Sequence, residues 1–116
     1  TSEDHPFVQV ELMMPILPIV RVPDVDAGIE MAVRVEHGNR HTAMMHSRNV
    51  DKLTKMAKLI QTTIFVKNGP SYAGIGVGGE GYTTFTIAGP TGEGLTSAKS
   101  FARRRRCVLV GGMDVR

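Results

Sequence analysis

The sequence NVDKLTKMAKLIQTTIFV, residues 49–66, combines the pattern of a helix with that of a strand. Its first part carries apolar side chains at helical spacing, while its lysines fall on the opposite face. The apolar positions are Val50, Leu53, Met56, Ala57 and Ile60. Residues 62–66 then bring β-branched and aromatic side chains together, a composition typical of a strand. The stretch therefore predicts a helix, opened by Asn49, that leads directly into a strand.

The same alternation extends toward the N-terminus. Residues 42–46 read as a short strand and residues 25–36 as an amphipathic helix. Before them, residues 16–22 are apolar and β-branched and read as a largely buried strand. The order strand, helix, strand, helix, strand predicts an α/β fold with a mainly parallel, three-layer sheet. Ligands of such sheets bind beyond the carboxyl ends of the strands.

Polar residues and glycine mark the ends of the first predicted helix. Asp24 or Asp26 can accept hydrogen bonds from the free N–H groups at its start. The residues 37–39, His-Gly-Asn, are of the kind that end a helix with a left-handed turn. The helix is therefore expected to begin near residue 25 and to stop near residue 36.

A glycine-rich segment, residues 69–81, follows the last strand of this series. It is too rich in glycine for a helix and too long for a simple turn. Gly74, Gly76 and Gly79 satisfy the literal pattern G-x-G-x-x-G. The pattern neither follows a strand directly nor opens a helix, so a dinucleotide fingerprint is disfavoured and a substrate-lining loop is favoured.

The remainder of the chain repeats strand and helix signals more weakly. Residues 82–88 alternate threonine with apolar residues as a strand does, and residues 89–94 break the pattern. Residues 95–103 are compatible with a helix and residues 107–110 with a last strand. We place a domain boundary here, with one domain over residues 1–90 and a tail over residues 91–116.

The composition of the 116 residues is that of an ordinary soluble globular domain, with 41% hydrophobic and 22% charged residues. No apolar run approaches the roughly 18–20 residues that cross a bilayer, and the acidic start does not resemble a signal peptide. The single cysteine, Cys107, cannot form an internal disulfide, which fits a reducing cytosol. We expect a cytoplasmic protein without a membrane segment.

The net charge of +3 does not by itself indicate nucleic acid, because much of the excess lies in the run of arginines at residues 103–106. The chain has no tryptophan and only six Tyr and Phe residues, which disfavours a surface that stacks on bases. The arginines read best as a solvated edge. A contact between subunits is the second interpretation, and phosphate or nucleic-acid binding the third.

The four histidines do not predict a metal site. His41 and His46 are five residues apart on the predicted strand and face opposite sides, and no cluster of cysteine or carboxylate accompanies them. Glu11 is more informative, because it is an acid among apolar residues just before the predicted strand at 16–22. It is either a surface residue or an acceptor for ligand hydroxyls.

Three segments carry a resemblance to a known family. Residues 11–22, ELMMPILPIVRV, resemble the Glu-Ile-Phe-Gly-Pro-Val-Leu-Pro stretch of the aldehyde dehydrogenase superfamily. Residues 36–43, EHGNRHTA, and residues 66–84, from VKNGPSYAG to GGEGYTT, resemble the CoA-acylating propionaldehyde and acetaldehyde dehydrogenases of bacterial microcompartments. The likeness covers essentially the whole chain but only about the last quarter of such an enzyme.

The resemblance implies an oxidoreductase that uses NAD and CoA. In the family a cysteine attacks the aldehyde, hydride transfer gives a thioester, and CoA takes the acyl group. Glu11 matches the glutamate that binds the nicotinamide ribose hydroxyls. Met13 stands where the wider superfamily has a phenylalanine against the nicotinamide, and Met14 replaces a glycine without an evident reason.

The resemblance also assigns the remaining roles. Ser71, Tyr72 and Ile75 fall on the loop that lines the aldehyde pocket. The tail is expected to supply an oligomerisation strand, so the partners are the preceding dinucleotide-binding part of the same polypeptide and other copies of it. Cys107 falls in this tail strand and is interpreted as a packing residue, with the nucleophile upstream.

The sequence leads to one principal hypothesis and one rival. The principal hypothesis is a C-terminal segment of a CoA-acylating aldehyde dehydrogenase, inactive by itself, in which the preferred aldehyde and encapsulation in a microcompartment stay open. The rival is a stand-alone CoA-binding or assembly module without catalysis.

Overall fold

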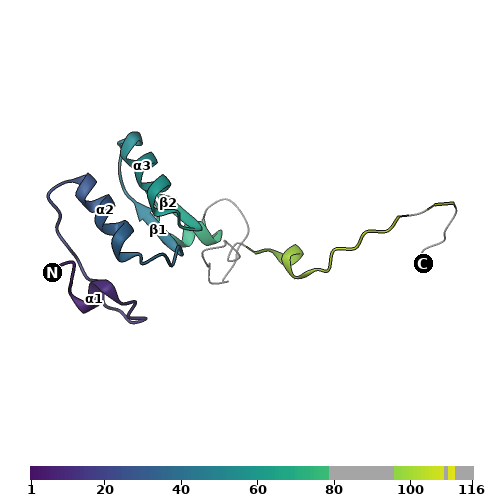
Figure 1. The fold of residues 1–116 in the computed structure, drawn as a ribbon, viewed down its shortest axis with the longest axis horizontal. Coiled ribbons are helices and arrows are strands. Elements are labelled where there is room, and N and C mark those ends of the chain that lie inside the picture. The colour runs from purple at the N-terminus through teal and green to yellow at the C-terminus, as the bar shows by residue number, and fades with distance from the viewer. Residues whose placement is uncertain (79–95, 109, 112–116) are drawn as a thin grey trace.

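The computed structural model describes residues 1–78, 96–108 and 110–111. The helices are α1 (Pro6–Gln9), α2 (Val25–Val35) and α3 (Val50–Ile60), and the strands are β1 (Thr42–Met45) and β2 (Ile64–Lys67). Two 3₁₀ helices follow, η1 (Ser71–Ile75) and η2 (Ala98–Phe101). The helices α2 and α3 and the two strands form one unit, and the tail around η2 runs away from it (Figure 1).

The two longer helices begin and end close to the predicted residues. The Asp24 carboxylate accepts a hydrogen bond from the Ala27 N–H at 2.8 Å, and the Asn49 side chain accepts one from the Lys52 N–H at 3.0 Å. His37 and Gly38 adopt left-handed backbone angles, with φ of 53° and 76°, just after α2 ends. The predicted caps and the predicted turn are confirmed.

The sheet is parallel, as the alternation of elements predicts. β1 pairs with β2 in a register that runs from Thr42 opposite Ile64 to Met45 opposite Lys67. α3 provides the crossover between them, which parallel strands require. The α/β class is confirmed, and the sheet has two strands within the described residues.

The two faces of this sheet are covered differently, because successive side chains of a strand point to opposite faces. On one face, Ile29 of α2 and Met56 and Ile60 of α3 are buried, and partly buried residues of both strands pack against them. On the other face Ile64 and Val66 are buried, and η1 lies against them. Each fully buried aliphatic side chain stabilises the fold by roughly 1.5–3 kcal/mol.

The predicted strand at residues 16–22 is wrong for this chain. These residues have no secondary structure and pair with no strand, and Leu17 is 83% exposed and Ile19 69% exposed. Their apolar pattern indicates a buried strand, but a strand forms only where a neighbouring strand can share hydrogen bonds with it. Pro15 and Pro18 also have no N–H group to donate to such a neighbour. The short helix α1 precedes this segment and has no counterpart in the sequence-based prediction. We call residues 1–22 the N-terminal arm.

The C-terminal predictions also need correction. The helix expected at 95–103 is reduced to the four residues of η2, which Ser97 caps. Residues 103–108 have no secondary structure, so the strand expected from residue 107 is not formed among them, and Cys107 is exposed, not packed. A strand needs a partner, and none of the described residues offers one here. The predicted strand at 82–88 and the boundary at residue 90 lie outside the described residues.

The surface of the chain is large for its mass. Its accessible area is 9413 Å², whereas a compact monomer of this mass exposes about 6200 Å². Its radius of gyration is 19.7 Å, compared with about 13 Å for a compact domain of this length. Among the described residues, many large apolar side chains are correspondingly exposed.

Candidate functional site

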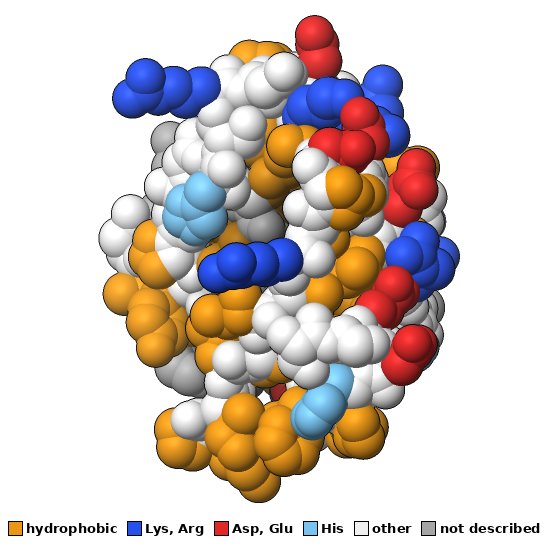
Figure 2. Space-filling view, turned by 90° about the vertical axis from the view of Figure 1, so that its left-hand side faces the viewer, with side chains coloured by type: hydrophobic (Ala, Val, Ile, Leu, Met, Phe, Trp, Pro, Cys, Tyr) orange, Lys and Arg blue, Asp and Glu red, His pale blue; other side chains and the backbone are white. Residues whose placement is uncertain are grey.

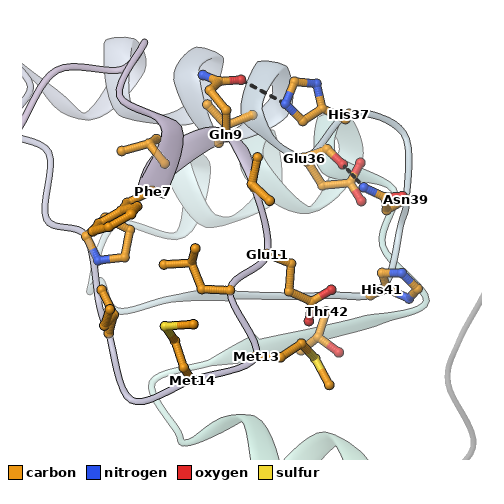
Figure 3. Close-up of a pocket in the computed structure, with 16 residues that line it drawn as sticks. Phe7, Gln9, Glu11, Met13, Met14, Glu36, His37, Asn39, His41 and Thr42 are labelled. Carbon is orange, nitrogen blue, oxygen red and sulfur yellow. Dashed lines mark hydrogen bonds between the residues drawn. The ribbon is translucent and has the colours of Figure 1, made fainter.

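A pocket of about 480 Å³ lies between the N-terminal arm and the segment that joins α2 to β1 (Figure 3). The arm contributes residues between 7 and 18, and the joining segment contributes residues between 35 and 42. Both cofactor candidates, Glu11 and Met13, line it. The sequence-based assignment therefore falls on a concave surface.

Side chains of the arm attach it to α2. The Arg34 guanidinium donates two hydrogen bonds of 2.9 Å to the two carboxylate oxygens of Glu3, and these bonds hold the pKa of Glu3 below its usual value. Gln9 donates to the Glu3 carbonyl at 2.7 Å and accepts from the His37 ring N–H at 2.8 Å (Figure 3). These contacts fix the arm as one wall of the pocket.

The opposite wall is a turn that folds around Glu36. The Glu36 carboxylate accepts a hydrogen bond from the Arg40 N–H, and the Asn39 side chain donates to the Glu36 carbonyl at 3.0 Å. This turn directs His41 and Thr42 into the pocket lining. The pocket therefore offers carboxylate, hydroxyl and imidazole groups beside apolar residues, a combination that suits an amphiphilic ligand.

Backbone strain concentrates around this pocket. Of the five non-glycine residues with positive φ in the described part of the chain, Met13 and His37 line the pocket and Arg40 lies between two lining residues. A left-handed conformation costs an L-residue roughly 1–2 kcal/mol. Such strain clusters at functional sites, so its position agrees with a binding role for the pocket.

Glu11 and Met13 are both accessible to a ligand. Met13 is 88% exposed, and Glu11 is also exposed. Figure 3 shows both side chains at the end of the pocket where Thr42 and His41 lie, away from Phe7. The carboxylate can thus accept hydrogen bonds from a ligand that the methionine contacts through its apolar side chain.

The three substrate candidates lie elsewhere. Ser71, Tyr72 and Ile75 are on η1, which follows the carboxyl end of β2, and none of them lines the 480 Å³ pocket. Tyr72 is 63% exposed, whereas Ile75 is half-buried. β1 connects the two places, because Thr42 lines the pocket and η1 contacts β1. The described residues therefore do not bring the cofactor and substrate candidates into one cavity.

The glycine pattern does not form a dinucleotide site in the described residues. Gly74 is part of η1 and Gly76 ends it with a φ of 89°, so neither glycine opens an α-helix. Gly79, the third glycine of the pattern, is outside the described residues. The sequence-based interpretation of this segment as a loop other than a dinucleotide fingerprint agrees with this arrangement.

Several residues of the site escaped the sequence analysis. Gln9 and His37 are 28 positions apart and meet only because the arm folds back on α2. Glu36 and Asn39 looked like helix-end residues and also shape the pocket wall. Of these features, only the strained turn at residues 37–40 could be predicted from the local sequence, through the His-Gly-Asn triplet at residues 37–39.

The described residues show neither a metal-binding cluster nor a membrane-spanning helix. Residues 1–78, 96–108 and 110–111 contain no group of three or more His, Cys, Asp or Glu side chains that is arranged to hold a metal ion. Within the same residues, no helix combines the length and the apolar character needed to span a bilayer.

Comparison with known proteins gives a consistent picture. No protein-family model matches the chain. The propanal dehydrogenase (CoA-propanoylating) of Salmonella typhimurium is 62% identical over 115 residues, which are 99% of this chain and 25% of that protein. The chain thus spans about a quarter of the length of the curated relatives it matches.

Solved structures agree in sequence and in fold. The propionaldehyde dehydrogenase of Rhodopseudomonas palustris with bound propionyl-CoA matches 94% of this chain and 24% of its own, with 78% identity and a TM-score of 0.86. The propionaldehyde dehydrogenase from the fucose utilisation bacterial microcompartment of Clostridium phytofermentans matches the whole chain and 27% of its own, with 58% identity and a TM-score of 0.84. An engineered glycolyl-CoA reductase with bound NADP⁺ is similar as well. By sequence and by fold, nearly the whole of this chain therefore matches about a quarter of the length of CoA-acylating aldehyde dehydrogenases, as the resemblance implies.

Proposed function

We propose that this chain works as part of an enzyme that converts a short-chain aldehyde, CoA and NAD to acyl-CoA and NADH. The observation that carries the proposal is the 78% identity, at a TM-score of 0.86, to a propionaldehyde dehydrogenase with bound propionyl-CoA. At this similarity the chain retains the fold that would present its pocket residues to the same ligands.

We assign Glu11 and Met13 to cofactor binding. Glu11 would accept hydrogen bonds from the ribose hydroxyls beside the nicotinamide, and Met13 would contact the nicotinamide through its apolar side chain. When bound, the nicotinamide supplies the hydride acceptor. The exposure of both residues in one pocket supports this assignment.

We assign Ser71, Tyr72 and Ile75 to contact with the aldehyde. They follow the carboxyl end of β2, and ligands of parallel α/β sheets bind at that edge. The exposed Tyr72 and the half-buried Ile75 offer apolar surface for a short alkyl group.

The nucleophile is expected from another part of the polypeptide. The reaction requires a thiolate that attacks the aldehyde carbon beside donors for the developing oxyanion. Cys107, the only cysteine of this chain, is exposed in the extended tail and does not line the pocket. We therefore propose that the preceding polypeptide supplies both the cysteine and the dinucleotide-binding domain.

Association with other copies and the cellular location complete the proposal. The extended residues 103–108 and the exposed Val108 suit a tail that pairs with another subunit, so we propose a homo-oligomer. The microcompartment origin of one similar structure supports a cytoplasmic enzyme that works inside such a compartment.

A chimaeric enzyme tests the proposal directly. In it, this chain replaces the matching segment of the Rhodopseudomonas palustris propionaldehyde dehydrogenase. The chimaera should form NADH only when aldehyde and CoA are both present, and the isolated 116-residue chain should form none. A folded chimaera without turnover, or turnover by the isolated chain, would contradict the proposal.

A further inference from the structure

Gly74 is packed against the sheet without room for a side chain. A Cβ atom at this position would lie 2.1 Å from Ile64 Cγ2 and 3.3 Å from Val66 Cγ2, both on β2. Ordinary van der Waals contact begins at 3.4 Å, so η1 would have to move by at least about 1.3 Å to accept a methyl group. The partners are buried strand residues, so η1 is the element that yields.

The segment that enters η1 is also fixed. The Asn68 side chain accepts a hydrogen bond of 2.7 Å from the Ser47 N–H and donates one of 2.9 Å to the Ser47 carbonyl. The Asn68 N–H donates to the Met45 carbonyl at 3.0 Å. Asn68 thereby extends the pairing of β1 and β2 beyond their last residues, and η1 begins three residues later from a fixed point.

Backbone hydrogen bonds at both ends of η1 restrict its movement. The Ala73 N–H donates to the Pro70 carbonyl and the Val77 N–H donates to the Tyr72 carbonyl, each at 3.0 Å. A displacement at Gly74 is therefore transmitted to the side chains on either side of it in the same 3₁₀ turn.

We propose that Gly74, through its contact with Ile64, is a positioning residue that sets the aldehyde preference of the enzyme. The missing side chain allows η1 to lie on β2, and this placement fixes where Tyr72 and Ile75 stand. The inference rests on the proposed function, because it uses the assignment of these two residues to the aldehyde. Gly74 itself is not a catalytic residue.

The test compares Gly74→Ala with Gly69→Ala in the chimaeric enzyme. A Cβ at Gly69 would meet its nearest atom at 3.4 Å, an ordinary contact, so Gly69→Ala is the matched control in the same loop. Gly74→Ala should lower kcat/KM for propionaldehyde by about 10- to 100-fold, since a shift near 1 Å has effects of this order. Gly69→Ala should stay within about threefold of the parent.

Two further readouts separate positioning from general damage. The ratio of kcat/KM for propionaldehyde to that for acetaldehyde should change by at least roughly threefold in Gly74→Ala, because one methylene group in an apolar pocket is worth about 10-fold or more. The KM for NAD should stay unchanged, because Glu11 and Met13 line a pocket that excludes η1.

A second variant keeps the test decisive if Gly74→Ala does not fold. Ile64→Ala removes the Cγ2 atom that the new methyl group would strike, so the double variant should fold and recover at least part of the lost activity relative to Gly74→Ala. A double variant that stays unfolded while Ile64→Ala folds would overturn the packing argument. A folded Gly74→Ala enzyme with parental aldehyde kinetics would overturn the proposal, whereas a parent chimaera without turnover would refute the proposed function instead.

Discussion

The helix–strand unit, residues 25–75, and the two flanks of the chain are stabilised in different ways. The unit buries six apolar side chains between α2, α3, the two strands and η1. The described residues of the flanks, 1–22 and 96–111, include no buried residue. The flanks instead expose Met13, Leu17, Phe101 and Val110, each by more than three-quarters of its surface. The unit thus depends on its own contacts, whereas the described residues of the flanks have no buried core of their own.

Figure 2 shows the consequence on the face that carries the arm, where apolar side chains gather along the lower edge. Exposed Phe7, Met14, Ile16 and Leu17 are among the apolar residues of this arm. A soluble monomer rarely leaves so many neighbouring apolar groups uncovered. We propose that the preceding part of the polypeptide covers them.

The largest expected effect is on the core of the unit. Met56→Ala should lower the free energy of unfolding by about 2–5 kcal/mol, because it leaves a cavity between α3 and the sheet. Leu17→Ala, in the arm, should change it by less than about 0.5 kcal/mol, since that side chain is 83% exposed. Urea unfolding of the isolated chain, followed by circular dichroism, measures the free energy of unfolding of both variants. Similar losses of stability in the two variants would contradict the distinction between the helix–strand unit and the flanks.

Substitutions in the N-terminal arm should change the affinity for the cofactor without changing the stability of the fold. Glu11→Gln in the chimaeric enzyme should raise the KM for NAD about 10- to 100-fold, since a hydrogen bond to a charged group contributes roughly 1.5–3 kcal/mol. Its unfolding midpoint should not move. Glu30→Gln is the control, because Glu30 is exposed on α2 and does not line the pocket. Equal effects of the two changes on the KM for NAD would contradict the assignment of Glu11.

A smaller effect is expected where α3 ends. Gln61 follows the helix with a φ of 50°, a conformation that glycine adopts without strain. Gln61→Gly should stabilise the chain by about 0.5–1 kcal/mol. Lys58→Gly, inside the same helix, should destabilise it by about 1 kcal/mol. Thermal unfolding of the two variants should therefore show opposite shifts, and shifts of the same sign would be inconsistent with the left-handed cap.

The smallest effect concerns the ion pairs between α2 and α3. Hydrogen bonds from Lys52 and Lys55 lower the pKa of Asp26 to about 2. Because the folded-state pKa lies below its usual value near 3.8, any stabilisation is complete above about pH 4 and is lost as the pH falls through 2. The three side chains are half-exposed, so water screens the ion pairs and the effect should be small.

The measurement for Asp26 is the unfolding midpoint of the parent chain and of Asp26→Asn at pH 6 and at pH 2. The difference between the two proteins should shrink at the lower pH. Asp4→Asn, an exposed position in the arm, should show no such convergence. A constant difference for Asp26→Asn would show that the ion pairs do not act in this way.

Local patterns predicted the unit well because its signals and its partners lie within the same stretch of chain. The same helix followed by a strand is indicated by Asn49, by the apolar positions of α3 and by the β-branched residues of β2. The segment at 16–22 carries an equally apolar pattern and failed as a strand. Its apolar pattern indicates burial, but no strand within the described residues pairs with it.

The candidate site divides in the same way. Glu11 stood out as an acid among apolar residues, and the resemblance to a family assigned it to a cofactor. The contact between Gln9 and His37 and the packing of Gly74 on Ile64 were not predictable, because both join residues that only the tertiary fold brings together. The left-handed angle of Met13 likewise has no signal in the residue type.

Hydrogen exchange of the isolated chain and of the chimaeric enzyme can show whether the flanks become covered in the complete enzyme, because it reports protection region by region. Amides in α2, α3 and the strands should be protected in both proteins. Amides of residues 16–22 and 103–108 should exchange freely in the isolated chain and become protected in the chimaera, where neighbouring polypeptide covers them. Equal protection of these two segments in both proteins would contradict the claim that the flanks are completed by the rest of the enzyme.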